Sequence, residues 1–192
     1  RRSSDLSQFF SRDCSWQSRG GCCKTQRVIA YYQKAKSLVN LSRDKALLLD
    51  ALKVFRKDGK RLVFTNGCFD ILHPGHITLL KQAKAFGDIL IVGLNSDASV
   101  KHLKGDARPI FNEKDRLYML EALSSVDLVC VFEEATPIEL ISVIQPDIHV
   151  KGGDYRPEDL PETPIVESLG GRVEIVPFIE GQSTSAIIEK LK

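Results

Sequence analysis

The sequence predicts an α/β fold, a Rossmann-like, doubly wound parallel sheet of about five strands. Three observations predict it. Short apolar runs alternate with longer amphipathic segments from about residue 45 to the end of the chain. The run at 88–94 is almost entirely apolar, as in a parallel strand that is covered on both faces. Glycines and polar residues directly follow several runs, which is where ligands bind in such sheets.

The first elements are a helix, a strand and a second helix. Residues 44–57 carry a broad apolar face and end at Asp58-Gly59, which predicts a helix, and a shorter amphipathic helix is expected at 28–41. The apolar run at 62–64 predicts a buried strand, and the apolar spacing at 77–84 predicts the helix after it.

The alternation then continues to the carboxyl end. Pro137 falls in the first turn of one expected helix, where its missing N–H removes no hydrogen bond. Because parallel strands end at the same edge, the polar segments that follow them should meet there. Further strands are expected at 88–94, 127–132, 147–150 and 172–176, and further helices at 112–123, 136–144, 158–169 and 183–191.

Length and composition bound the number of domains. A chain of 192 residues that is 43% hydrophobic can bury one core, so we expect residues 44–192 to form a domain with its leading helix. Residues 1–43 are expected to be a flexible basic tail or a vector-derived extension. No apolar run reaches the ~18 residues needed to cross a bilayer, so no membrane contact is expected. Five scattered cysteines fit a reducing compartment, which predicts a cytoplasmic protein.

The charge is unevenly distributed. Residues 1–44 hold nine Lys or Arg against three Asp, whereas the rest of the chain has more acidic than basic residues. A local group of side chains must therefore hold any anion that the domain binds, and nucleic acid is excluded as a general partner.

One stretch, 65–76, has the sequence Thr-Asn-Gly-Cys-Phe-Asp-Ile-Leu-His-Pro-Gly-His and joins the first strand to its helix. A strand-to-helix turn directs backbone N–H groups and the positive end of a helix toward one point, which suits a phosphate. Gly67 and Gly75 allow the backbone to come close to a ligand. His73 and His76 can reach the same anion, so the stretch predicts a phosphate-binding turn.

The stretch resembles the signature of the nucleotidylyltransferase superfamily, which includes cytidylyltransferases and several adenylyltransferases. With the segments 95–97, 101–105, 108–109, 151–155 and 181–185, the chain is most similar to the D-glycero-beta-D-manno-heptose 1-phosphate adenylyltransferase branch. The resemblance covers about residues 45–192. It implies transfer of AMP from ATP to a sugar 1-phosphate, giving ADP-heptose and pyrophosphate for lipopolysaccharide precursors. It also implies small-molecule substrates, a homodimer, and a heptose 7-phosphate kinase on a separate chain.

The resemblance assigns catalysis to His73, His76, Lys104 and Thr184. The histidines would bond phosphates near the breaking bond, and their protonation state stays open. Lys104, helped by Lys101 or Arg108, would close over the phosphates from a glycine-containing loop; the alternative is a solvated basic loop.

The same resemblance assigns the remaining contacts to ATP. Asp70 and Asp97 are expected to brace loops or the ribose, the Tyr155 ring to stack on the base, and Cys68 to use its backbone rather than its thiol. Mg²⁺ would arrive bound to the triphosphate rather than in a protein-built metal site. The positions are Asn66, Gly67, Cys68, Phe69, Asp70, Gly75, Asn95, Asp97, Lys101, Arg108, Lys151, Gly153, Asp154, Tyr155, Ser183 and Ser185.

Two positions depart from related sequences, and the second of them separates the branches. Ser185 stands where the family has Thr, which keeps the hydroxyl. Phe178 stands where glycerol-phosphate cytidylyltransferases carry Arg, which favours adenylyl transfer. Two other hypotheses stay open: a cytidylyltransferase acting on glycerol 3-phosphate or another phospho-alcohol, and a nucleotide-binding sensor that has lost catalysis.

Overall fold

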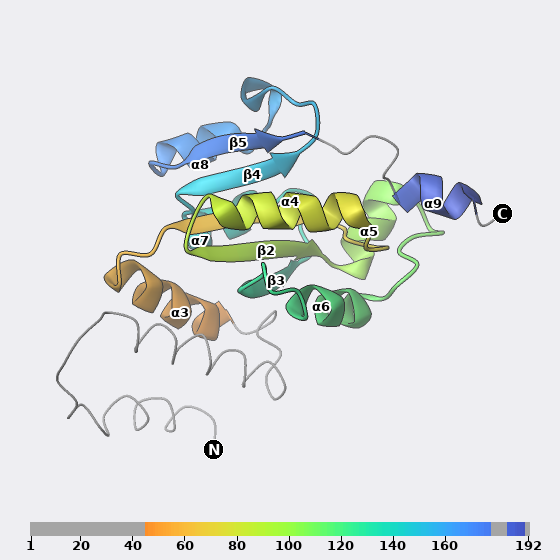
Figure 1. Ribbon diagram of the computed structural model, residues 1–192, viewed down its shortest axis with the longest axis horizontal. Coiled ribbons are helices and arrows are strands. Elements are labelled where there is room, and N and C mark those ends of the chain that lie inside the picture. Colours follow the sequence, from red (N-terminus) through yellow and green to blue (C-terminus); the bar gives the residue numbers. More distant parts are fainter. Residues whose placement is uncertain (1–44, 178–183, 191–192) are drawn as a thin grey trace, which may run out of the picture.

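The computed structural model describes residues 45–177 and 184–190. They form a five-stranded sheet in the order β3-β2-β1-β4-β5, in which all neighbours are parallel (Figure 1). The chain adds β2 and β3 on one side of β1 and then crosses to add β4 and β5 on the other, so the strand order reverses between β1 and β4. The predicted fold class is confirmed. The strands are β1 (Leu62–Gly67), β2 (Ile89–Asn95), β3 (Leu128–Phe132), β4 (Ile148–Gly152) and β5 (Arg172–Val176).

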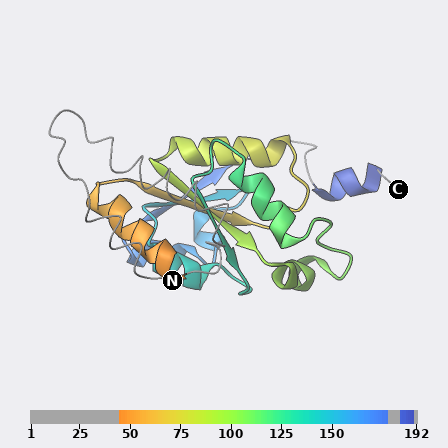
Figure 2. The same cartoon turned by 90° about the horizontal axis from the view of Figure 1, so that it is seen from below.

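Helices cover both faces of the sheet (Figures 1 and 2). One face packs against α4 (Pro74–Ala85) and α6 (Glu113–Glu121). The other packs against α3 (Lys45–Lys57), α7 (Ile138–Ile144) and α8 (Thr163–Ser168), the last preceded by the short 3-10 helix η1 (Pro157–Asp159). Two more helices, α5 (Asp97–Lys104) and α9 (Thr184–Lys190), lie at the carboxyl ends of the strands (Figure 1).

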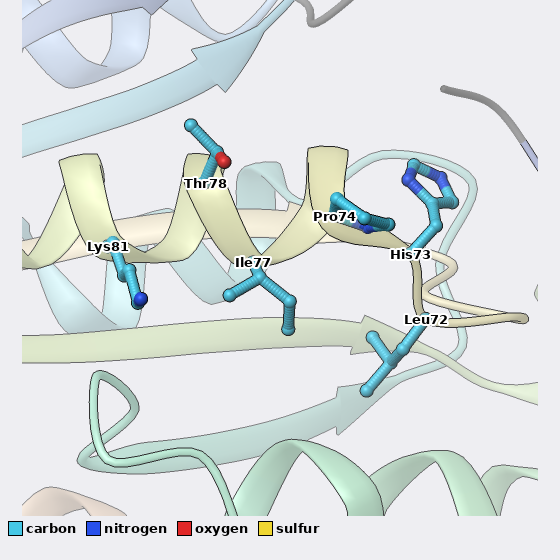
Figure 3. A pocket seen from close by; sticks show the side chains of 6 residues that line it. All are labelled: Leu72, His73, Pro74, Ile77, Thr78 and Lys81. Atoms are coloured by element: carbon cyan, nitrogen blue, oxygen red, sulfur yellow. The ribbon is translucent and has the colours of Figure 1, made fainter. Parts of the chain in front are cut away.

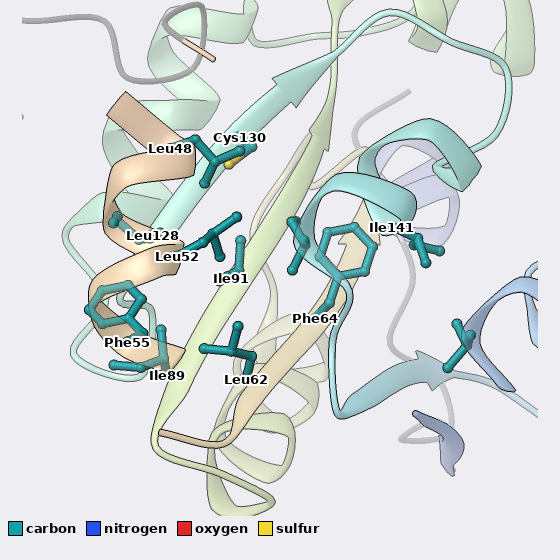
Figure 4. Packing of buried hydrophobic residues seen from close by; sticks show 13 residues of the cluster. Leu48, Leu52, Phe55, Leu62, Phe64, Ile89, Ile91, Leu128, Cys130 and Ile141 are labelled. Carbon is teal, nitrogen blue, oxygen red and sulfur yellow. The ribbon is translucent and has the colours of Figure 1, made fainter. Parts of the chain in front are cut away.

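The alternation of side chains along the strands divides the core into two clusters. In β1, Val63 packs in the cluster under α4, whereas Leu62 and Phe64 pack in the cluster under α3 and α7. Figure 4 shows the second cluster, where Leu52 and Phe55 of α3 lie against β2 and β3. The leading helix is therefore part of the core.

Three predicted boundaries were wrong near the signature. β1 continues to Gly67, so Thr65, Asn66 and Gly67 belong to the strand, and β4 continues to Gly152, so Lys151 lies in it rather than after it. α4 begins at Pro74 rather than at 77. Polar strand ends and a proline-led first turn lack the apolar spacing on which the predictions rested.

Two predicted elements differ in kind. The helix expected at 158–169 is broken into η1 and α8, because Pro161 has no N–H to donate and Pro164 fits only the first turn of a helix. The loop expected to carry Lys101 and Lys104 is the helix α5, whose first turn is capped by the Ser96 hydroxyl accepting from the Ser99 N–H.

Some expectations lie outside the described residues. They are the helix at 28–41, the character of residues 1–43, and the positions 178–183 and 191–192 that bound the last helix. Within the described ranges, the structure contains no helix with the length and apolar character needed to span a membrane.

The burial of α3 predicts a large effect of Phe55→Ala. Its side chain is 0% exposed, so truncation should lower the free energy of unfolding by about 3–5 kcal/mol through lost burial and a cavity. Leu49→Ala in the same helix, at a side chain that is 38% exposed, should cost less than about 1 kcal/mol. Urea denaturation of both variants checks this. Equal effects would contradict the packing of α3 on the sheet.

Candidate active site

The two signature histidines stack against each other where α4 begins. Their ring centroids are 3.8 Å apart with an interplanar angle of 26°, and the Phe69 ring packs against His76 at 5.1 Å. His73 precedes the first helical residue in an extended conformation, and its side chain does not cap the helix. The inner nitrogen, Nδ1, of each ring is buried with no partner in the described part of the chain. This leaves Nε2 as the nitrogen that can reach a ligand.

Burial keeps both imidazoles neutral in the free protein. It lowers the pKa of His73, and it lowers the pKa of His76 to about 4, an effect that the adjacent His73 strengthens and the Ile71 backbone partly opposes. A bound polyphosphate would act in the opposite direction, because a nearby anion favours the protonated ring.

The turn between β1 and α4 contains a strained residue, Phe69, and a close contact at Gly67. Phe69 adopts a left-handed conformation with φ of 45°, which is costly for a bulky residue, and its side chain is buried. A Cβ on Gly67 would lie 3.1 Å from the Phe69 ring. A side chain at position 67 would therefore crowd the Phe69 ring that packs against His76.

Asp70 fixes the loop that follows α5. Its carboxylate accepts hydrogen bonds from the N–H groups of Ile110 and Phe111 at 2.8 and 3.0 Å and from Arg108 Nε at 2.5 Å. Burial alone would raise the pKa of Asp70, but these bonds outweigh it and hold the pKa below its ordinary value. In this structure Arg108 is thus bound to Asp70 and does not extend over a ligand.

A buried arginine that the sequence analysis did not select joins the ends of β1 and β2. Arg116 of α6 is 0% exposed, and its Nη1 donates to the carbonyl oxygens of Cys68 and Asn95 at 2.6 and 2.8 Å. Its Nη2 donates to Asp97 at 2.7 Å and its Nε to the Phe111 carbonyl at 3.0 Å. In the sequence, Arg116 is one charged residue of a polar helix, so no local signal marks it as buried.

Two predicted lid residues lie on α5 instead. Lys101 and Lys104 are exposed, and neither makes an ion pair with any other residue that the structure describes. Burial raises the pKa of the Cys68 thiol. The positive charges of Lys104, Arg116 and Arg108 lower this pKa, but by less than burial raises it. A protonated thiol fits the expectation that Cys68 contributes its backbone rather than a nucleophile.

The last helix, α9, lies against the signature turn. The Thr184 hydroxyl lies 3.5 Å from the Ile71 carbonyl, two residues before His73. Ser185 follows in α9, and Ser183 lies outside the described residues.

The end of β4 carries the remaining predicted contacts. Gly153 is buried with φ of 138°, and its N–H donates to the Val176 carbonyl at 2.9 Å. Asp154 and Tyr155 follow in an exposed loop, with the Tyr155 side chain 53% exposed. The Lys151 side chain is held in place, because its ammonium group donates hydrogen bonds to Asn66 and Glu162.

A hollow of about 490 Å³ runs along the first turns of α4 (Figure 3). Of the predicted site it includes only His73, and apolar side chains form most of its wall. Such an apolar wall does not suit a polyphosphate. Its lining residues are Leu72, His73, Pro74, Ile77, Thr78 and Lys81.

Comparisons with known proteins show the family of this chain. Residues 64–189 match the family described as Cytidylyltransferase-like. The chain belongs to this family. The resemblance to the nucleotidylyltransferase superfamily is thereby confirmed, and the matched range begins in β1 and ends in α9.

Relatives of the family extend the comparison. The chain is 55% identical over 148 residues to "Bifunctional protein HldE" of Geotalea uraniireducens, covering 75% of this chain and 30% of the relative. It is 50% identical over 170 residues to the protein of the same name from Helicobacter pylori, covering 88% and 36%. The chain thus spans about a third of the length of these relatives.

A solved structure is similar as well. The lipopolysaccharide core biosynthesis protein from Thermoplasma volcanium aligns with a TM-score of 0.53 and 31% identity, covering 65% of this chain and 100% of that protein.

The depressed pKa of His76 predicts a pH-dependent stability. The unfolded chain, with a histidine pKa of 6.5, binds the proton more readily than the folded chain, with a pKa of about 4. The free energy of unfolding should therefore fall as the pH drops from 6.5 to 4. His76 should account for about 3 kcal/mol of this loss, and its effect should disappear above pH 6.5.

Denaturation at a series of pH values checks this prediction. His76→Gln should reduce the slope between pH 6.5 and 4, whereas His102→Gln, on the exposed part of α5, is the matched control. A slope that His76→Gln leaves unchanged would show that His76 does not titrate in a buried environment.

Proposed function

We propose that this chain transfers AMP from ATP to a sugar 1-phosphate, D-glycero-beta-D-manno-heptose 1-phosphate, giving ADP-heptose and pyrophosphate for lipopolysaccharide precursors. The stacked pair of His73 and His76 at the start of α4, next to Thr184 of α9, is the observation that carries the proposal. The names of the relatives, HldE and a lipopolysaccharide core biosynthesis protein, support this substrate class.

The chemistry needs positioning and charge stabilisation more than a strong base. The attacking oxygen of a sugar phosphate is already ionised at neutral pH, and it displaces pyrophosphate from the α-phosphate of ATP in line. Neutral His73 and His76 would donate from Nε2–H to phosphate oxygens, since a lone pair at the buried Nδ1 is less costly than a buried, unpaired N–H. These donors would stabilise the charge that develops in the transition state.

Two lysines on α5 would help to hold the phosphate groups of the two substrates. Lys104 and Lys101 are exposed and lie on a helix that starts directly after β2, beside the signature turn. Their flexible side chains can neutralise two phosphate groups that repel each other. The Thr184 hydroxyl and the first N–H groups of α9 would contact the triphosphate from the opposite side.

We propose that Mg²⁺ enters with the triphosphate. The carboxylates of Asp70 and Asp97, at the ends of β1 and β2, are occupied by Arg108 and Arg116. A magnesium ion that keeps several waters and binds mainly phosphate oxygens fits such a site. A homodimer, a separate upstream kinase and a cytoplasmic location stay predictions from the sequence.

Pyrophosphate release over a small matrix of substrates tests the function. ATP with heptose 1-phosphate should give the highest kcat/KM among ATP, CTP and GTP combined with heptose 1-phosphate, glycerol 3-phosphate and phosphocholine. Activity with CTP alone would instead support a cytidylyltransferase. ATP binding without pyrophosphate release from any acceptor would support a sensor that has lost catalysis.

The role of the histidines predicts a specific kinetic loss. His73→Asn and His76→Asn should each lower kcat by about 10²–10³-fold, because each removes a donor to the transition state. His102→Asn on α5 is the matched control and should stay near the wild-type value. Single-turnover pyrophosphate release measures the effect, and a loss of less than threefold in both variants would remove the histidines from the mechanism.

A further inference from the structure

A polar network that the proposed mechanism does not use lies under the carboxyl ends of β1 and β4. Lys151 Nζ bonds Glu162 Oε1 at 2.8 Å and Asn66 Oδ1 at 3.0 Å, and His149 Nε2 lies 3.4 Å from the same Asn66 oxygen. The network is buried, with side chains of Lys151 and Glu162 that are 18% and 5% exposed and a His149 that is 0% exposed.

This network fixes the orientation of the Asn66 amide. An ammonium group can only donate, so the atom that faces Lys151 must be the amide oxygen. Burial lowers the pKa of His149 to about 3, so its ring is neutral, and its Nε2–H form can donate to the same oxygen. Both lone pairs of Oδ1 are then used. The amide can offer only its Nδ2 donors to a ligand.

The neighbouring strand restricts the amide further. A Cβ on Gly93 of β2 would lie 3.2 Å from Asn66 Cβ and 2.8 Å from the Phe64 ring. Glycine at 93 therefore makes room for both side chains of β1. Asn66 is half-buried, and its Nδ2 has no partner among the described residues and stays accessible.

The position of Asn66 indicates which part of a nucleotide it meets. Asn66 follows Phe64 on the α7 and α8 face of the sheet, because every second side chain of a strand points the same way, whereas the histidines lie at the start of α4, which covers the opposite face. The exposed Tyr155 ring lies in the loop after β4, and the exposed lysines of α5 lie after β2. A nucleotide with its phosphates at α4 thus has its uncharged part toward β4. A neutral amide donor suits that part better than a phosphate.

We propose that Asn66 donates from Nδ2 to an acceptor on the nucleoside of ATP, and that Lys151, paired with Glu162, is a positioning residue that fixes this donor without touching the nucleotide. The inference rests on the proposed function for the identity of the nucleotide. It differs from the sequence-based expectation that Lys151 itself lines the nucleotide pocket.

Calorimetric binding of two probes tests the proposal without any acceptor substrate. ATP carries the nucleoside, and inorganic tripolyphosphate carries only the phosphates. Asn66→Ala should weaken ATP binding about 5–10-fold, as expected for one lost hydrogen bond, and leave tripolyphosphate binding unchanged. Equal losses for both probes, or no loss for ATP, would overturn the role of Asn66.

A double-mutant cycle tests the role of Lys151. Replacing the ion pair by Lys151→Met with Glu162→Leu avoids leaving a buried charge unpaired. This variant should weaken ATP binding severalfold, and adding Asn66→Ala to it should give no further loss beyond Asn66→Ala alone. Additive losses would mean that Lys151 contacts the nucleotide directly and would overturn the positioning role.

Two controls keep the result interpretable. Arg156→Met removes a positive charge that is 72% exposed and paired with Asp159 in the loop after β4, and it should change neither affinity. If the ion-pair variant does not fold, judged by its thermal midpoint, Lys151→Met with Glu162→Gln replaces it in the same cycle. Because the cycle measures only ATP binding, a chain without pyrophosphate release would refute the proposed reaction and still decide this inference.

Discussion

The geometry of the site depends on one buried guanidinium. Arg116 donates to the carbonyl ends of β1 and β2 and to the Asp97 carboxylate, so it joins the signature turn to the start of α5. A buried cation needs this many acceptors to offset its desolvation. The same bonds hold the signature turn and the lysine-bearing helix at a fixed separation, as catalysis by positioning would require.

Asp70 extends this arrangement to the next loop. Its bonds to Arg108 and to two backbone N–H groups attach the segment before α6 to the signature turn. The carboxylates of Asp70 and Asp97 at this edge are thus paired with arginines, while Lys101 and Lys104 of α5 are exposed. Under the proposed function, these lysines would supply positive charge for a polyphosphate in a domain with more acidic than basic residues.

Burial accounts for the state of the titratable groups. Burial lowers the pKa of both stacked histidines, and burial keeps the Cys68 thiol protonated despite three nearby cations. On the other side of β1, a Lys–Glu pair neutralises itself and orients a neutral amide. Under the proposed function, the two sides of β1 would offer different chemistry to the two parts of one nucleotide.

The sequence by itself determined the fold class and the order of the five strands along the chain, because both depend on local apolar spacing. It also located the turn that carries His73 and His76, whereas phosphate binding by this turn stays a prediction. Only the tertiary structure decided that Arg116 is buried, that Arg108 binds Asp70, and that Lys151 faces Asn66 and Glu162. These contacts join residues up to 85 positions apart. The sequence does not distinguish a charged residue that will be buried from one that stays in solvent. Tertiary packing decides which charged side chains are desolvated and paired.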